Sequence, residues 1–252
     1  MNRDIETKEY RFNEEKHLHQ IVVDGEWKNL TGITTILSVL AKPALIQWSA
    51  NCAVDFIETI IKSTPNWRWS EQDWPNIFTE ARTIHRKKKE KAGDIGTQIH
   101  VEIETLIKEA ILSSDGRIEG NKEVSEFAQH FVNWAKENKV KFLESEKHLY
   151  SKKLFIGGIM DIVCELDGKL WIADIKTSSG IYFEAFWQMA GYELMMEEMG
   201  YPSLSGSIVL NIKKDGSFSE KRSVSNEDSR KGFLACLDIY RLSEKIKNTI
   251  TN

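Results

Sequence analysis

The stretch GGIMDIVCELDGKLWIADIKTSSG, residues 157–180, decides the fold, because it predicts a tight β-hairpin with charges inside apolar strands. Two short apolar runs are joined by Asp167-Gly168, a dipeptide typical of two-residue hairpin turns. Asp161 interrupts the first run and Asp174 the second, and Lys176 follows two residues later. Because burying an unpaired charge is costly, charged residues in otherwise apolar strands need a partner or a function.

The turn sets the expected pairing of the two strands. With Asp167 and Gly168 as the loop, pairing outward along both strands brings Asp161 directly opposite Asp174. Their Cβ atoms would then lie about 4.5–5.5 Å apart. Because side chains alternate along a strand, Lys176 lies on the same face as the two acids.

Two like charges that face each other across a ladder are destabilising, and burial increases the cost. One aspartate could be protonated, a lysine could neutralise the pair, or a divalent cation could bind between them. Lys176 alone leaves net negative charge, and hard oxygen ligands at this spacing suit Mg²⁺ or Mn²⁺. The hairpin by itself leaves two other interpretations open: a solvated face of an edge hairpin, or a register slipped by one residue.

Two further pairs of residues are spaced to share one face of a helix. In GTQIHVEIE, residues 96–104, His100 and Glu104 are four residues apart, and Gly96 predicts a helix start shortly before the histidine. In WQMAGYELM, residues 187–195, Gln188 and Tyr192 have the same spacing. A structural histidine and a solvent-facing, half-buried helix are the alternative interpretations.

A basic run, HRKKKEK at residues 85–91, precedes His100 and includes Lys87 and Lys88. It predicts either a solvated helix face or the local positive patch that an acidic protein needs to hold nucleic acid. The 252-residue chain has a formal net charge of -4, which argues against a generally basic coat for nucleic acid.

The pattern along the chain predicts an α/β protein. We expect a hairpin at Asp24-Gly25, helices interrupted near Gly93 and Gly96, the hairpin of residues 157–180, a further helix, a hairpin at Asp215-Gly216 and a final helix from about Ser225. Residues 1–95 would form an N-terminal hairpin and helical lobe, and residues 96–252 the core.

Cysteine usage and hydropathy indicate a soluble intracellular protein. Cys52, Cys164 and Cys236 are far apart and lack zinc spacing, so we expect reduced core thiols. The N-terminus is polar and charged, unlike a signal peptide, and no apolar run is long enough to cross a bilayer.

Five short motifs in this order resemble the PD-(D/E)XK nuclease superfamily, within it the RecB-like and phage-type exonucleases. They are GTQIH, EKHLYS, GGIMD, ADIKTS and QMAGY, and they span residues 96–192. The preceding TGITTILSVLAKPALIQWS is also similar to N-terminal regions of phage nucleases of this group. The resemblance implies a restriction-endonuclease-like core, a central mixed β-sheet flanked by helices, with an N-terminal helical lobe.

The resemblance also assigns roles to individual residues. It implies that the catalytic residues are Asp161, Asp174, Lys176 and Glu146. It implies that the metal ligands are His100, Asp161, Asp174 and the backbone carbonyl of Ile175. The residues expected to contact nucleic acid are Gln188, Tyr192, Thr177, Lys87 and Lys88. Gly157 and Gly158 are expected to leave room for a nucleic-acid backbone.

The sequence departs from the family pattern at two points. Met160 stands where the family name has proline. Some relatives hold an iron–sulfur cluster on four cysteines, but this chain has three without suitable spacing, so no cluster is expected.

The resemblance implies an exonuclease dependent on one or two Mg²⁺ or Mn²⁺ ions, acting on DNA with a free end in recombination, repair or phage replication. Its products would carry a 5′-phosphate and a 3′-hydroxyl, and its place would be the cytoplasm of a bacterial cell or a phage-infected host. Two alternatives stay open: a structure-specific or sequence-specific endonuclease on the same fold, and an inactive relative that binds nucleic acid. Polarity, strand preference, DNA versus RNA, a homo-oligomer and a partner protein of recombination or replication are not readable from the sequence.

Overall fold

The computed structural model describes residues 4–64, 70–120, 123–224 and 227–250, and it has a mixed α/β architecture. The chain divides into two compact units, one made of Met1–Leu40 with Ile99–Asn252 and the other of Ala41–Gln98. This division differs from the one expected at residue 95, because the N-terminal strands group with the sheet and not with the helices that follow them.

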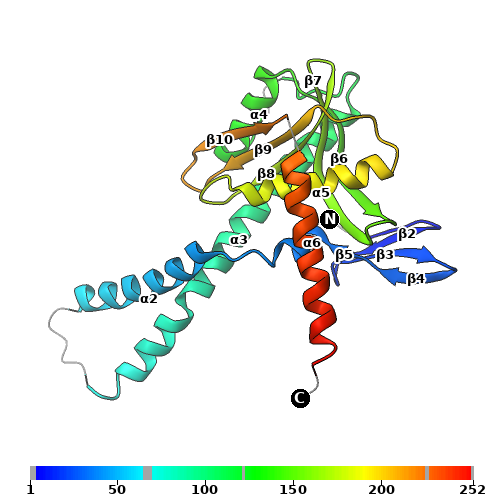
Figure 1. Ribbon diagram of the computed structural model, residues 1–252. Coiled ribbons are helices and arrows are strands. Elements are labelled where there is room, and N and C mark those ends of the chain that lie inside the picture. The colour runs from blue at the N-terminus through cyan, green and yellow to red at the C-terminus, as the bar shows by residue number, and fades with distance from the viewer. Residues whose placement is uncertain (1–3, 65–69, 121–122, 225–226, 251–252) are drawn as a thin grey trace. The chain divides into compact units, whose positions relative to one another are not determined.

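A mixed sheet forms the centre of the first unit (Figure 1). Its strand order is β10-β9-β8-β7-β5, and β6 also pairs with β7. β8 and β9 are parallel, as are β5 and β7, and the other neighbours are antiparallel. The strands are β5 (Thr31–Gly32), β6 (Lys141–Ser151), β7 (Ile156–Leu166), β8 (Lys169–Lys176), β9 (Gly206–Ile212) and β10 (Phe218–Ser223).

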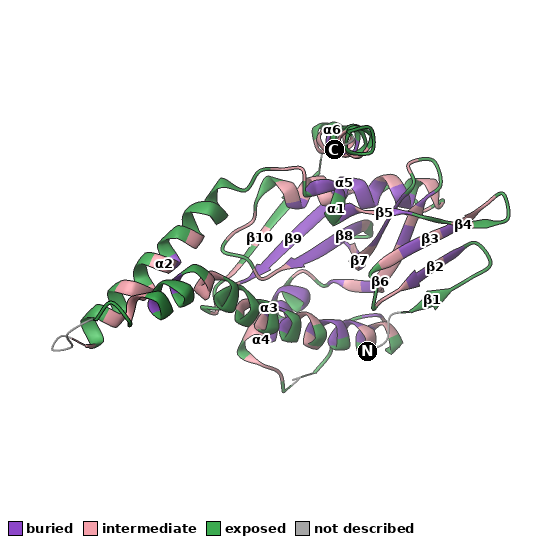
Figure 2. Ribbon diagram, turned by 90° about the horizontal axis from the view of Figure 1, so that it is seen from below, coloured by how far each residue is buried: buried purple, intermediate pink, exposed green. Residues whose placement is uncertain are grey.

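Helices cover both faces of this sheet (Figure 2). On one face lie α1 (Ile33–Leu37), α5 (Phe183–Glu198) and α6 (Glu227–Lys247). On the other face lie α4 (Glu126–Glu137) and the end of α3 that belongs to this unit. A core cluster between the sheet and α5 includes Met160, Ile172, Met189, Met195 and Val209, all fully buried.

Helix α4 illustrates how local sequence sets an element. Ser125 is its N-cap, and the Ser125 hydroxyl accepts the Ala128 N–H at 3.2 Å. The Glu102 carboxylate in turn accepts the Ser125 N–H at 2.7 Å, which ties the start of α4 to α3. Ala128, Phe131 and further apolar residues at helical spacing are buried, so the amphipathic face lies against the sheet.

The N-terminal residues form a separate four-stranded antiparallel sheet in the order β1-β2-β3-β4. Its strands are β1 (Ile5–Glu6), β2 (Tyr10–Asn13), β3 (Leu18–Val23) and β4 (Glu26–Asn29). Val23 pairs with Glu26, so the hairpin expected at Asp24-Gly25 is confirmed. The chain then pairs β5 with β7 of the main sheet, which explains why this segment belongs to the first unit.

The second unit contains α2 (Pro43–Ser63) and the first part of α3 (Trp74–Leu112). α3 is continuous through Gly93 and Gly96, so the interruption expected there is wrong. A glycine inside a helix costs only about 1 kcal/mol relative to alanine, and the good helix formers around these two outweigh it. His100 therefore lies in the interior of a helix and not near its start.

The turns of the main sheet follow the sequence closely. Leu166 pairs with Lys169, and Asp167 and Gly168 have φ values of 49° and 71°, as a two-residue turn with positive φ requires. A hairpin also forms around Asp215-Gly216, between β9 and β10. α6 begins at Glu227, and Ser225, the expected start of this helix, lies outside the described residues.

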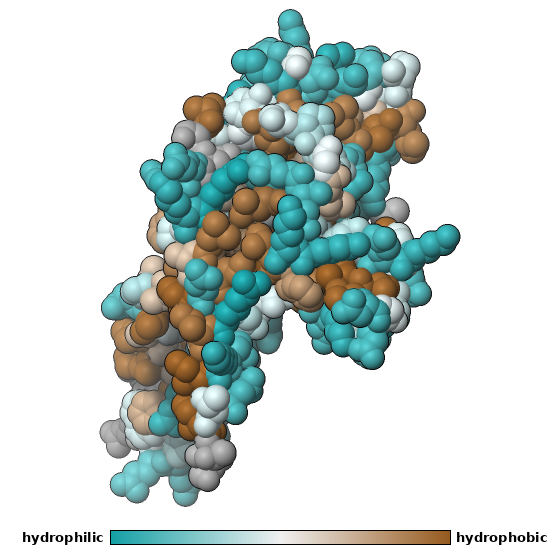
Figure 3. Space-filling model, turned by 45° about the vertical axis from the view of Figure 1, so that its right-hand side comes forward, coloured by the Kyte–Doolittle hydropathy of each residue, from teal (hydrophilic) through white to brown (hydrophobic). Residues whose placement is uncertain are grey.

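The three cysteines are buried free thiols, as expected for core positions. Within the described ranges, no helix is both long and apolar enough to cross a membrane. Apolar residues are not confined to the core, and Figure 3 shows them gathered in patches between hydrophilic residues on one face of the molecule.

Candidate active site

The hydrogen-bonded pairing of β7 with β8 stops just before the two aspartates that the sequence predicts as site residues. Its last pair is Ile162 with Ala173, in the register expected from the turn. Asp161 lies one residue beyond this pair, and its Oδ2 accepts the Ile175 N–H at 2.9 Å. A side-chain carboxylate thus takes the place of the backbone acceptor with which a continued ladder would meet this N–H.

Asp174 forms the buried floor of the site. It lies on β8, between β7 and β9, and its side chain is 4% exposed against 19% for Asp161. Burial and, to a smaller extent, the nearby Asp161 carboxylate raise the pKa of Asp174, Lys176 and His100 oppose the rise, and the resulting pKa is about 6. Its Oδ2 accepts no well-directed hydrogen bond among the described residues. The ionised form of Asp174 is therefore poorly solvated here.

Lys176 lies beside Asp174 and is held from two sides. Its Nζ is 2.8 Å from Asp174 Oδ2, an ion pair, and donates to Gln188 Oε1 at 2.9 Å. Desolvation lowers the pKa of Lys176, but the carboxylates of Asp174 and Asp161 more than offset this, so the pKa is raised. Lys176 therefore remains an ammonium ion at neutral pH and is not a proton acceptor.

Gln188 and Tyr192 share one face of α5, as their spacing predicts, and this face is turned toward the site. Gln188 Nε2 donates to the Tyr192 hydroxyl oxygen at 3.0 Å, which orients the amide so that its oxygen meets Lys176. Burial, followed by the charges of Asp174 and Asp161, raises the pKa of Tyr192 well above its ordinary value. The phenol stays neutral, and its hydrogen is oriented away from the Gln188 donor.

His100 reaches the site from α3. Its Nδ1 lies 3.9 Å from Asp161 Oδ2, and its side chain is 31% exposed, so the pair is accessible from outside. Glu104, four residues on, makes an ion pair with Lys108 at 2.5 Å.

Glu146 comes to the site from β6 in an unusual backbone conformation. Its neighbours Ser145 and Lys147 pair with Ile162 and Met160, so Glu146 lies opposite Asp161. Its φ of 50° is in the left-handed region, which residues other than glycine rarely adopt inside a strand. Its charge helps raise the pKa of Tyr192, after burial and the two aspartates. Glu146 is therefore a third acid of this site.

Side chains of the protein itself fill the space left by two glycines. A Cβ at Gly158 would lie 2.7 Å from a ring carbon of Tyr192, and one at Gly157 would lie 2.8 Å from Cβ of His19. The expectation that they leave room for a nucleic-acid backbone is therefore wrong. Gly158 is needed for the close approach of Tyr192 to β7, and Gly157 for that of His19.

Thr177, Lys87 and Lys88 are the other residues predicted to contact nucleic acid. Thr177 is partly exposed and directly follows Lys176 at the end of β8. Lys87 and Lys88 are exposed on the part of α3 that belongs to the second unit, where Lys87 Nζ pairs with Glu80 at 3.3 Å.

Sequence reasoning missed two polar residues next to the cluster. Asn211 is fully buried, and both its side-chain polar atoms are without a hydrogen-bond partner among the described residues. It is the partner of Lys176 in the parallel β8–β9 register, so the two side chains share one face of the sheet. Glu184 lies one helical turn before Gln188, and its buried Oε2 has no hydrogen-bond partner in the described part of the chain. An asparagine inside the apolar run IVLNI was the available signal for Asn211.

The donor chemistry of the site fits a hard divalent cation. The carboxylates of Asp161 and Asp174, with that of Glu146 nearby, outnumber the ammonium group of Lys176, which is the ion-pair partner of the buried Asp174. Within the described ranges, no group of three or more His, Cys, Asp or Glu side chains forms a ready-made metal site. His100 Nδ1 and Asp161 Oδ2 lie 3.9 Å apart across the cluster.

Comparison with known proteins adds little to this geometry. No family model matches the chain, and no curated protein matches it. Among solved structures, the chain is similar to the crystal structure of SSO0001, with 17% identity and a TM-score of 0.30 over 50% of this chain. The match spans 58% of that chain, a little over half its length. A likeness this weak carries no argument about family or activity.

Proposed function

We propose that this chain is a Mg²⁺- or Mn²⁺-dependent deoxyribonuclease with a restriction-endonuclease-like core, and that it acts as an exonuclease on DNA with a free end. One observation carries the proposal. Asp161, in the middle of β7, and Asp174 and Lys176, at the end of β8, come together where the β7–β8 ladder stops, and two partly buried carboxylates there face one lysine.

A purely structural ion pair explains this cluster less well. Such a pair is stable when its charges balance and its remaining oxygens are hydrogen-bonded. Here Lys176 faces two aspartates, and the buried Asp174 oxygen lacks a well-directed hydrogen bond among the described residues. The surplus of negative charge at neutral pH favours an additional cation, which would relieve the raised pKa of Asp174.

The residues that would hold the ion are Asp161 and Asp174, with His100 and the carbonyl of Ile175. A divalent ion held there supplies Lewis-acid activation of a phosphodiester and of the attacking water. Glu146 lies at the edge of the same cluster and adds negative charge that favours cation binding.

The chain's own residues supply positioning and positive charge. Lys176 remains an ammonium ion, and Asp174 and Gln188 fix its place, so it stabilises negative charge that develops on the phosphate. Gln188 also fixes the rotation of the Tyr192 hydroxyl by donating to its oxygen, which leaves the phenolic hydrogen to bond a phosphate oxygen. Thr177 follows Lys176 and would contact the same strand.

An end-processing activity is favoured over an endonuclease because the Gln188–Tyr192 pair matches the Q-x-x-x-Y motif of RecB-like exonucleases. Purified protein with Mg²⁺ or Mn²⁺ should release label from linear DNA and leave covalently closed circles intact. Single- and double-stranded substrates labelled at the 5′ or the 3′ end would show polarity and strand preference in the same experiment. Cutting of closed circles would replace the exonuclease assignment with the endonuclease one.

A matched pair of variants separates this activity from a contaminating nuclease. Asp174→Asn removes the buried charge of the site, whereas Asp167→Asn changes an aspartate at the turn of the same hairpin, where asparagine is equally favourable. Label release should disappear in Asp174→Asn and persist in Asp167→Asn. Equal activity of the two variants would remove the basis of the proposal.

The basic run would contribute affinity and not chemistry. Replacing Lys87 and Lys88 together with glutamate should weaken DNA binding and flatten its salt dependence, because fewer counterions are released. The cleavage rate at saturating DNA should stay unchanged. A reduced rate at saturation with unchanged affinity would argue against this role.

A further inference from the structure

The C-terminal half of α6 carries an apolar stripe that the fold leaves uncovered. Ile239, Leu242, Ile246 and Ile250 are each more than half exposed. Their spacing of three and four residues places them along one side of a helix. Ile250 continues this side past the end of α6, because its N–H bonds to the Ile246 carbonyl at 3.1 Å.

Other residues of α6 pack against the core of the first unit. Phe233, Cys236 and Leu237 are buried in the core cluster. At about 100° per residue, their side of the helix is turned roughly 130° from the stripe. α6 cannot bury the stripe by rotating, because that would expose Phe233.

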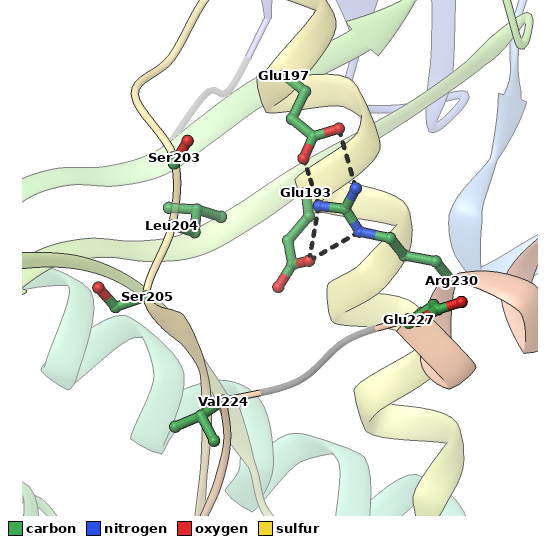
Figure 4. A pocket seen from close by; sticks show the side chains of 8 residues that line it. All are labelled: Glu193, Glu197, Ser203, Leu204, Ser205, Val224, Glu227 and Arg230. Atoms are coloured by element: carbon green, nitrogen blue, oxygen red, sulfur yellow. Dashed lines mark hydrogen bonds and ion pairs between the residues drawn. The ribbon is translucent and has the colours of Figure 1, made fainter.

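An arginine clamp also fixes the start of α6 on α5. The Arg230 guanidinium lies between the carboxylates of Glu193 and Glu197, at 3.3 Å from Glu193 Oε2 and 3.0 Å from Glu197 Oε2 (Figure 4). These residues line a cavity of about 360 Å³ at the α5–α6 junction. Figure 2 shows α6 as the outermost layer on this face of the sheet, beyond α5.

We propose that the stripe is the contact surface of a symmetric homodimer, in which α6 packs antiparallel against α6 of a second copy. A two-fold axis passing between Leu242 and Ser243 would set Ile239 against the partner's Ile246 and keep Leu242 close to its own copy. The same axis sets Ala235, which is also exposed, against the partner's Ile250. A stripe that meets itself in this way is what a two-fold contact requires.

The charged residues beside the stripe favour a second copy of this chain as the partner over a helix of another protein. In an antiparallel pair, the same flank of each helix faces the other, and Asp238 and Lys245 lie on one flank of the stripe. The same axis brings Asp238 within about 3 Å, measured along the helix, of the level of the partner's Lys245, and Lys245 equally near the partner's Asp238, which long side chains can span. Neither residue makes an ion pair within the part of the chain that the structure describes, so both are available.

Sedimentation velocity over a concentration series tests the proposal. The unmodified chain should dimerise, and Leu242→Asp should abolish the dimer by placing two carboxylates beside the axis. Asp238→Lys or Lys245→Asp alone should weaken dimerisation by about tenfold, since each creates two symmetry-related repulsions. The double variant should restore it. A monomer at all concentrations, or a dimer indifferent to Leu242→Asp, would overturn the proposal, and failure of the double variant to restore dimerisation would overturn the antiparallel register.

Disulfide trapping gives a second, independent reading. The native cysteines are buried, so Leu242→Cys offers one new accessible thiol, close to its own copy across the axis. Mild oxidation should link two chains through this position. Asn248→Cys is also exposed but lies on another side of the helix, and it should not cross-link. Equal cross-linking of both variants would show random collision and not a defined contact.

Discussion

The carboxylate of Asp161 accepts the backbone N–H of Ile175 at 2.9 Å, one residue beyond the last pair of the β7–β8 ladder. This bond holds the two strands together where they would otherwise separate, and it does so with a charged group. Asp161 therefore has two tasks, closing the hairpin end and supplying charge to the site, and substitutions can separate them.

Asp161→Asn keeps an oxygen that accepts the Ile175 N–H but removes the charge. The fold should be retained and DNA cleavage lost. Asp161→Ala removes the acceptor as well, so it should also lower the free energy of unfolding by about 1–3 kcal/mol. Urea titration and label release measure the two effects. Equal destabilisation by both variants would show that charge, and not the hydrogen bond, holds the hairpin end.

The pKa of Asp174 predicts a pH dependence of stability in EDTA. Burial raises this pKa to about 6 from an ordinary value of 3.8, so the folded protein holds the proton more tightly than the unfolded chain does. The contribution is fully present below about pH 4 and is lost as pH rises through about 6. Between pH 4 and 7 the wild type should lose up to about 3 kcal/mol relative to Asp174→Asn, which does not titrate.

Mg²⁺ should act in the opposite direction, since it binds the ionised carboxylate. Its stabilising effect on the wild type should be larger at pH 7 than at pH 5, and Asp174→Asn should show little of it. Urea titrations at the two pH values, with and without Mg²⁺, measure this. Parallel pH profiles of wild type and Asp174→Asn would contradict the buried, ionisable state of Asp174.

Gly158→Ala should move Tyr192, because the added Cβ would lie 2.7 Å from its ring. Such overpacking costs about 1–3 kcal/mol of stability. Because Tyr192 accepts from Gln188, and Gln188 accepts from Lys176, the cleavage rate should fall as well. Gly180→Ala is the control, since the nearest atom its Cβ would meet is 3.9 Å away. Wild-type activity in Gly158→Ala would show that the position of Tyr192 is unimportant.

Asn211 should matter for cleavage more than for stability. It shares a sheet face with Lys176, and its polar atoms have no partner among the described residues, so Asn211→Leu removes no existing hydrogen bond. Stability should be unchanged or slightly higher. If Asn211 orients Lys176 when DNA is bound, kcat should fall roughly tenfold with KM unchanged. Ser207→Ala is the control and should leave kcat unchanged, since Ser207 is another buried residue of β9 whose hydroxyl has no hydrogen-bond partner within the described ranges.

The register of the β7–β8 hairpin could be predicted from the sequence, because a two-residue turn determines which residues of the two strands pair. The sequence could not show that the ladder stops before the two aspartates, because that depends on Asp161 bonding Ile175 by its side chain. The interruption expected at Gly93 and Gly96 was wrong, since helix propensity summed over neighbouring residues outweighs two glycines.

Pairings between strands that are far apart in the sequence also could not be predicted from local sequence patterns. The two residues of β5 carry no strand signal of their own, yet their parallel pairing with β7 ties the N-terminal sheet to the first unit. Spacing correctly placed Gln188 and Tyr192 on one helix face. The close neighbours of Lys176 from β9, above all Asn211, depend on which strand follows β8 in the sheet, and local patterns do not encode that order.

The most direct test of the proposed nuclease activity is the single-turnover rate of DNA cleavage by Lys176→Ala in saturating Mg²⁺ or Mn²⁺. Lys169→Ala, an exposed lysine on the same strand, is the matched control, and circular dichroism would establish that both variants are folded. The rate of Lys176→Ala should fall by roughly 10²–10³, the usual effect of losing one stabilising charge, while Lys169→Ala cleaves like the wild type. A folded Lys176→Ala protein that cleaves DNA at the wild-type rate would contradict the assignment of this site.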